Sequence, residues 1–173
     1  DLILLDVGAE YANYSSDLTR TIPVNGKFTE RQKQIYNAVL DMKNFATSLL
    51  VPGNNWYDYH KECGDFYTSK FLELGLLDKA DVQNEDKNWP AYKKYMMHGT
   101  SHHMGLDTHD YGILSDKFVE NMVFTVEPGI YLPAEGFGIR IEDDVVIQNS
   151  GEPFNLMKNI PIEVEEIEEL MNV

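Results

Sequence analysis

The chain has 173 residues and a formal net charge of −15, with 14 Lys and Arg against 29 Asp and Glu. This balance excludes nucleic acid as an expected partner, because phosphate backbones are bound through Lys and Arg. No apolar run approaches the roughly 20 residues that span a bilayer, so we expect no membrane partner either.

The chain opens on an apolar run, LILLDV (2–7), which predicts a buried central strand ending near Asp6. A native domain rarely begins inside a strand, so we expect this chain to be a piece of a longer protein, cut just before that strand. A turn-rich link, GAEYANYSS (8–16), precedes a second predicted strand, DLTRTIPV (17–24). The sequence NGK (25–27) then predicts a turn.

Two helices are predicted next. Thr29 and Gln32 match a capping box at the start of the first helix, which ends at Pro52-Gly53. The second helix is predicted from about Asp58 to Leu74, and residues 77–95 are polar and irregular. Apolar residues recur on one face of each helix: Ile35, Val39, Met42, Ala46 and Leu49 in the first, and Tyr59, Cys63, Phe66, Tyr67 and Leu74 in the second.

Two segments, 121–132 and 138–148, predict paired strands around a short Pro/Gly link. On the first, Glu127 shares a face with Thr125, and on the second, Glu142 shares a face with Arg140. The alternate positions are apolar and face a core (Phe124, Val126, Ile139 and Ile141). Each strand is therefore expected to point a carboxylate into a common polar pocket. The tail, 163–173, predicts a short acidic helix on the solvated surface.

Four carboxylates and a cluster of histidines suggest a metal site. The segment MMHGTSHHMGLDTHD (96–110) holds four of the five histidines, and Asp6, Asp17, Glu127 and Glu142 are carboxylates at or inside predicted strands, where they are costly to bury unpaired. Four such carboxylates in one pocket would repel one another, and either protonation or cations would relieve the repulsion. With one neutral imidazole they carry about −4, which two divalent ions would neutralise, and oxygen-rich ligation suits Mn²⁺, Fe²⁺, Co²⁺ or Zn²⁺. Two such ions can share a water, lower its pKa and present hydroxide to a carbonyl.

Each of these residues also has a structural interpretation. Asp6 could cap a strand end, Asp17 could belong to a turn, Glu127 could be a charge at a loop edge, and Glu142 could lie on a solvated strand face. The histidines could form a satisfied polar loop. Taken singly, each structural interpretation is at least as good as the functional one. Taken together, the ordered set favours a site.

Four segments, DVGAEYANYSSDLTRTIPVNGKFT, HGTSHHMGLDTHD, TVEPGIYLP and GIRIEDDVVI, resemble in order the signature segments of the proline-specific "pita-bread" metallopeptidases. The likeness is greatest to aminopeptidase P (Xaa-Pro aminopeptidase), with prolidase next, and runs from residue 1 to about 170. It implies an α+β fold, a curved antiparallel sheet with helices packed outside. Residues 1–173 would form the C-terminal part of the catalytic domain, without its upstream half, which carries another substrate-contacting histidine, and without the N-terminal domain.

The resemblance implies a role for each residue. Asp6, Asp17, His102, Glu127 and Glu142 would hold two divalent ions, with Mn²⁺ expected and Co²⁺, Zn²⁺ or Fe²⁺ as alternatives. Glu127 would also handle protons, His98 and His109 would contact the peptide and stabilise the transition state, and Arg140 would hold the groups around the site on the substrate side. His103 would only fill space. Asn13 and Asn121 stand where the family usually has Gly, and Asn tolerates positive φ, so we expect the same turns.

The resemblance therefore implies part of a dinuclear metallo-aminopeptidase that acts on peptides with proline in second position. A single cysteine, Cys63, fits a reducing compartment such as the cytoplasm. We expect the isolated chain to be inactive and to self-associate as a homo-oligomer, because its first strand would lack a cover. Two alternatives stay open: a prolidase, which cleaves only dipeptides, and a non-catalytic interaction module that keeps the fold.

Overall fold

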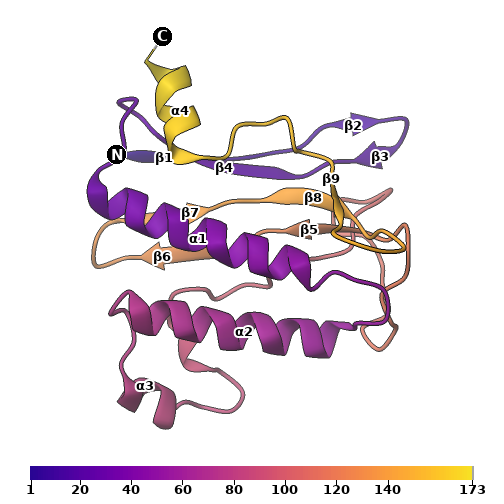
Figure 1. Cartoon of the computed structure of the whole chain (residues 1–173), viewed down its shortest axis with the longest axis horizontal. Helices are drawn as coiled ribbons and strands as arrows, with labels where there is room; N and C mark the ends of the chain where they lie inside the picture. The colour runs from indigo at the N-terminus through magenta and orange to yellow at the C-terminus, as the bar shows by residue number, and fades with distance from the viewer. Residues whose placement is uncertain (173) are drawn as a thin grey trace.

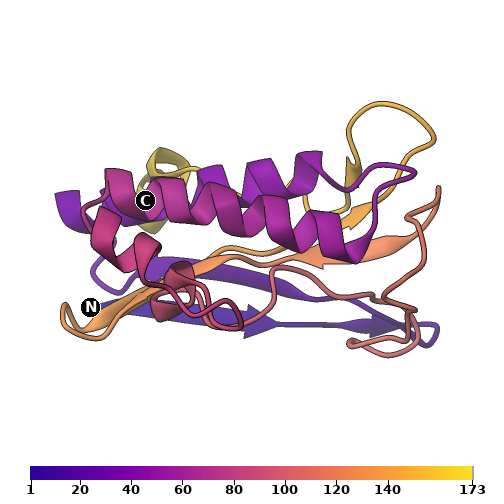
Figure 2. The same cartoon turned by 90° about the horizontal axis from the view of Figure 1, so that it is seen from below.

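The computed structural model describes residues 1–172 as two layers. Two long helices, α1 (Glu30–Ser48) and α2 (Trp56–Glu73), lie along one face of a set of short antiparallel strands (Figures 1 and 2). The remaining elements are, in chain order, β1 (Leu2–Val7), β2 (Glu10–Tyr11), β3 (Tyr14–Ser15), β4 (Leu18–Pro23), α3 (Lys79–Gln83), the 3₁₀ helix η1 (Ala91–Lys94), β5 (Val123–Val126), β6 (Gly129–Leu132), β7 (Phe137–Arg140), β8 (Asp143–Val146), β9 (Phe154–Asn155) and α4 (Val164–Met171).

All strand pairs are antiparallel: β1 with β4, β2 with β3, β6 with β7, and β8 with both β5 and β9. The α+β class with helices outside the strands is therefore confirmed. The predicted strands over 121–132 and 138–148 do pair, but each is interrupted. The first breaks at Glu127-Pro128 and the second at Ile141-Glu142. Proline has no N–H to donate to a ladder, so the chain changes partner there, and both breaks leave a glutamate at a strand end.

The prediction of a buried central strand over 2–7 is wrong. Among the described residues β1 pairs only with β4, and Ile3, Leu5 and Val7 are 43%, 39% and 52% exposed. Leu2 and Leu4, on the alternate face, are partly buried. The apolar run predicted two covered faces, and the described residues cover only one.

The helices form largely as predicted. The capping box of Thr29 and Gln32 is present at the start of α1, and the expected inward residues are buried except Leu49, Phe66 and Leu74, which are only partly so. The second helix begins at Trp56 rather than Asp58, because the Asn55 side chain accepts the first free N–H groups. Residues 77–95 are not wholly irregular, since they contain α3 and η1.

The tail helix α4 is more than a solvated surface element. Val164 and Ile167 are buried, so its apolar side packs against the body of the protein. The expected turns at Asn13 and Asn121 are confirmed, with φ of 65° and 70°. No helix within residues 1–172 is long and apolar enough to cross a membrane.

Candidate metal centre

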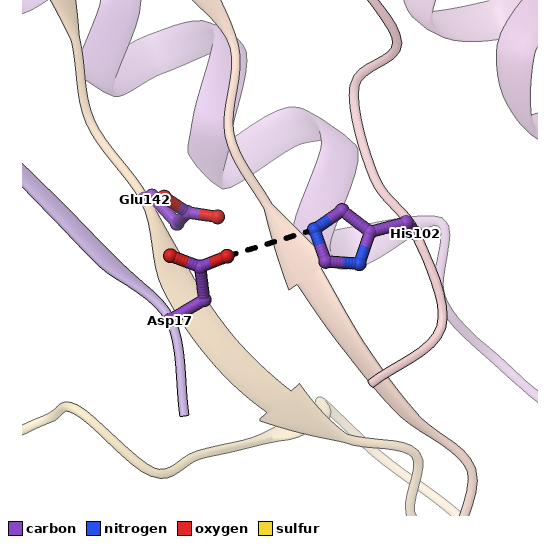
Figure 3. A group of neighbouring side chains, drawn as sticks. All are labelled: Asp17, His102 and Glu142. Carbon is purple, nitrogen blue, oxygen red and sulfur yellow. Dashed lines mark ion pairs between the residues drawn. The ribbon is translucent and has the colours of Figure 1, made fainter. Parts of the chain in front are cut away.

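Three side chains from distant parts of the sequence converge beside β8. Asp17 lies just before β4, His102 lies on the segment beside β5, and Glu142 lies just before β8. One ligand atom from each lies within 4.8 Å of the others, and His102 Nε2 is 3.8 Å from Asp17 Oδ2 (Figure 3). Each residue comes from a strand end or an extended segment, where backbone pairing fixes the direction of the side chain.

Glu127 and Asp6 lie at the edge of this group. Glu127 follows β5 directly, and its Oε1 is 3.7 Å from the same His102 Nε2. Asp6 lies on β1 opposite Thr19 of β4, is 52% exposed, and forms an ion pair with Arg140. The structure thus places three of the four predicted carboxylate ligands around the imidazole of His102, and the fourth, Asp6, beside them in contact with an arginine.

Burial raises the pKa values of three carboxylates at the centre. The pKa of Glu142 is raised to about 8, chiefly by burial and also by the charges of Glu127 and Asp17, although the hydrogen bond from Thr19 opposes this shift. Burial also raises the pKa of Glu127 to about 7, although Arg140 opposes this shift. The pKa of Asp17 is raised, first by burial and then by the charge of Asp6. Carboxylates crowded in this way need protons or cations between them.

The imidazole of His102 is oriented so that its neutral form can donate an electron pair to a metal ion. Its Nδ1 is 2.9 Å from the His103 carbonyl oxygen, which can only accept, so Nδ1 carries the proton and the Nε2 lone pair faces the carboxylates. Burial lowers the pKa of this ring and keeps it neutral. Oxygen donors with one neutral nitrogen form a set that fits a divalent ion such as Mn²⁺, Co²⁺ or Zn²⁺. The orientation of His102 by a backbone carbonyl is typical of histidines that bind metals.

A second set of side chains is linked to the residues of the centre. His98 Nδ1 donates to the Gly99 carbonyl at 2.7 Å, so its Nε2 accepts from the Tyr131 hydroxyl at 2.6 Å. Arg140 donates to the same hydroxyl at 3.5 Å and also pairs with Asp6. The His109 ring lies 4.2 Å from that of His102. Arg140 and His109 thus contact residues of the centre directly, whereas His98 is linked to it through Tyr131 and Arg140.

His103 points away from this group, into aromatic packing. Its Nε2 accepts from Trp56 Nε1 at 3.3 Å, and its ring centroid lies 4.5 Å from that of Phe124. This environment agrees with the space-filling role expected for it.

The sequence did not indicate three residues that the structure places in or beside the site. Thr19 donates to the Glu142 carboxylate at 2.6 Å and accepts from Arg140 at 3.1 Å. Tyr131 links His98 to Arg140, and the buried Asp144 accepts the backbone N–H of Asp17 at 3.0 Å. Alternation along the strands carried a signal for two of them, since Thr19 shares a face of β4 with Thr21, and Asp144 falls two positions after Glu142.

The fold and the site define a centre of carboxylates and one imidazole, held by antiparallel strands, that fits divalent metal ions. Residues 1–149 match metallopeptidase family M24, so the chain belongs to this family. The α+β pita-bread prediction agrees with this membership and with the solved structures below.

Several relatives share nearly the whole chain. It is 41% identical to the Xaa-Pro aminopeptidase of Haemophilus influenzae over 99% of this chain and 42% of that protein. It is 42% identical to the Xaa-Pro aminopeptidase of Escherichia coli over 99% of this chain and 41% of that protein. A zinc-substituted E. coli aminopeptidase P in complex with product has a TM-score of 0.86 at 40% identity, covering 99% of this chain and 41% of the other. The chain thus spans about two fifths of the length of these relatives.

Proposed function

We propose that this chain is the C-terminal, metal-binding part of the catalytic domain of an Xaa-Pro aminopeptidase. The enzyme would hold two divalent ions, with Mn²⁺ as the expected metal, and would remove the N-terminal residue from peptides with proline in second position. The observation that carries the proposal is the convergence of Asp17, His102 and Glu142 within 4.8 Å. The likeness to Xaa-Pro aminopeptidases over 99% of the chain supports the choice of substrate.

The five carboxylate and imidazole residues would share the ligation. Asp17 and Glu142, which lie close together, would contribute to holding both ions, and Asp6 would join them by giving up its contact with Arg140. When bound, divalent ions supply Lewis acidity toward a carbonyl and lower the pKa of a bound water. In the protein without metal, burial raises the pKa of Glu127 to about 7, and in the loaded enzyme this carboxylate would take up and return a proton beside the bound water. These properties suit the hydrolysis of a peptide bond.

The surrounding histidines would handle the substrate. His98 is held neutral by burial, which lowers its pKa, and its ring is oriented by Tyr131. His109 lies beside His102, so a peptide bound at the centre would come within reach of its ring. We assign His98 and His109 to peptide contacts and to stabilisation of the developing oxyanion. Arg140 would hold the substrate side together through Tyr131 and Asp6.

The isolated chain is proposed to be inactive and to self-associate. The open face of β1 carries Ile3, Leu5 and Val7, and exposed apolar strand faces favour association. The relatives are more than twice as long as this chain, which supports a larger enzyme whose remaining part would complete the substrate pocket. The single cysteine supports a cytoplasmic location.

The test uses the full-length protein that carries this chain, loaded with Mn²⁺. Release of glycine is measured from a Gly-Pro-Xaa tripeptide and from the Gly-Pro dipeptide, with Gly-Ala-Xaa as the control for proline. We expect cleavage of the proline tripeptide alone or in preference to the dipeptide. Cleavage of the dipeptide alone would make the protein a prolidase, and metal binding with no cleavage of either would favour a non-catalytic module.

A further inference from the structure

A buried ionic cluster lies on the side of β8 that faces away from the metal centre. Asp143 is 1% exposed and its Oδ1 is 2.7 Å from Nη2 of Arg20, while its Oδ2 pairs with Lys43 of α1. Asn155 of β9 also donates to this Oδ2 at 2.7 Å. Arg20 and Lys43 are 7% and 4% exposed. Asp143 is therefore the meeting point of β4, α1 and β9, one residue away from Glu142.

The other N–H groups of Arg20 donate hydrogen bonds to backbone carbonyls, two of them beside the metal centre. Its Nη1 donates to the carbonyl oxygen of Glu142 at 2.7 Å and to that of Thr19 at 3.0 Å, and its Nε donates to that of Pro161 at 2.9 Å. A guanidinium is a rigid planar fork, so these bonds fix the two strands at one relative position. Lysine cannot reproduce such a fork, because its charge sits on a single nitrogen.

The two carbonyls that Arg20 binds belong to Thr19 and Glu142, whose side chains contact each other on the side of the metal centre. The Thr19 hydroxyl donates to the Glu142 carboxylate at 2.6 Å, and the Glu142 N–H donates to the Thr19 carbonyl at 3.0 Å. A shift of either backbone would therefore move the carboxylate relative to Asp17 and His102. The cluster behind the strands and the ligand in front of them are mechanically connected through Thr19 and Glu142.

Stability alone is a weak reason for such a cluster. Burying three charges has a large desolvation cost, and buried ion pairs are often no more stabilising than apolar side chains of similar volume. Partners that orient a metal ligand from behind, by contrast, commonly change metal affinity by roughly 10- to 100-fold when they are removed. The geometry therefore agrees better with orientation than with stability.

We propose that Arg20, anchored by Asp143, is a positioning residue that sets the direction of the Glu142 carboxylate. Its role is to keep this ligand aligned with Asp17 and His102 before a metal ion arrives. The proposal rests on the proposed function, because its consequences are measured as metal affinity and as turnover.

The first test compares Arg20→Lys with the wild type in the full-length protein. The variant keeps the charge opposite Asp143 but loses the fork. We expect the Kd for Mn²⁺ to rise by roughly 10- to 100-fold, kcat on Gly-Pro-Xaa at subsaturating Mn²⁺ to fall, and KM to stay unchanged. The KM prediction follows because the proposed peptide contacts, His98 and His109, lie on the other side of the strands. A matched control is Arg31→Lys, which alters the exposed ion pair with Glu135 and should leave all three values unchanged.

Two further variants distinguish an effect of ligand orientation on Mn²⁺ affinity from effects of net charge and of folding. Lys43→Met removes a buried cation but leaves the bonds of Arg20 in place, so Mn²⁺ affinity should stay within about threefold of wild type if orientation is what matters. The double variant Lys43→Met/Asp143→Asn keeps the net charge of the cluster but removes the ionic anchor of Arg20. It should lower Mn²⁺ affinity as Arg20→Lys does, and it serves in its place if that variant does not fold.

The result that overturns the proposal is wild-type Mn²⁺ affinity in folded Arg20→Lys, or in the double variant. A purely structural role would instead lower the Tm of the metal-free protein and leave the Kd unchanged. A loss of affinity in Lys43→Met as large as that in Arg20→Lys would show that charge, rather than orientation, controls binding. The proposed peptidase function fails separately: wild-type protein that binds Mn²⁺ but cleaves no proline peptide would contradict it, while the affinity comparison would still decide the role of Arg20.

Discussion

Metal binding at this centre should depend steeply on pH. The carboxylates of Glu142 and Glu127 have pKa values raised by burial to about 8 and about 7 in the absence of metal. A divalent ion binds their deprotonated forms, so each must release its proton before or during binding. Binding of Mn²⁺ should therefore become tighter as pH rises from 6 to 8.

The size of the effect follows from these two values. At pH 6 a group with a pKa of about 8 is deprotonated about 1% of the time, and one with a pKa of about 7 about 10% of the time. At pH 8 the same groups are deprotonated about half and about nine tenths of the time. An ion that needs both should thus bind on the order of several hundred-fold more tightly at pH 8, or about 3 to 4 kcal/mol. His102 adds little to this pH dependence, because burial lowers its pKa and the ring is already neutral.

Calorimetric titration with Mn²⁺ at pH 6, 7 and 8 tests this prediction in the full-length protein. Repeating each titration in buffers of different ionisation enthalpy counts the protons released, which should exceed one near pH 6. Glu142→Gln, which has no such proton, is the control and should show a shallower dependence on pH. Equal affinities at pH 6 and pH 8 without proton release would refute the electrostatic account of the centre.

Three further predictions concern individual residues and the metal-free protein. Glu127→Gln should lower kcat by at least roughly 10²-fold while the fold survives, because it removes both a ligand charge and a proton acceptor; a kcat above about a tenth of wild type would contradict its assignment. His98→Ala and His109→Ala should lower kcat with metal still bound, whereas His102→Ala should lower metal content, and equal loss in all three by elemental analysis would disprove this division. Without metal, the Tm should fall as pH rises from about 5 to about 8, because the folded protein binds protons on Glu142 and Glu127 that the unfolded chain has released; thermal scans in chelator, with Glu142→Gln as control, measure the slope.

The sequence indicated the convergence of the centre through local pattern. Alternation along 138–148 placed Arg140 and Glu142 on one face, and the structure brings both to the side where Asp17 and His102 lie. The turns at Asn13 and Asn121 could be predicted because positive φ favours Asn among non-glycine residues. These features depend on neighbours in sequence, which is why a pattern can report them.

Other features depend on contacts between distant segments. The ion pair of Asp6 with Arg140 joins residues 134 positions apart, and no local pattern predicts it. Tyr131 and Thr19 resemble ordinary strand residues until their hydroxyls are placed against His98 and Glu142. The open face of β1 was mispredicted for a related reason, since an apolar run indicates what a strand can bury but not which segment covers it.

The most direct test of the central claim is a stepwise Mn²⁺ titration of metal-free full-length protein, following bound metal and glycine release from Gly-Pro-Xaa in the same samples. We predict that activity is absent without metal and reaches its maximum as the second Mn²⁺ per chain binds. Substitution of Asp17 by Asn should abolish both metal binding and glycine release. Full activity in the metal-free protein, or wild-type metal binding in Asp17→Asn, would contradict the assignment of this centre.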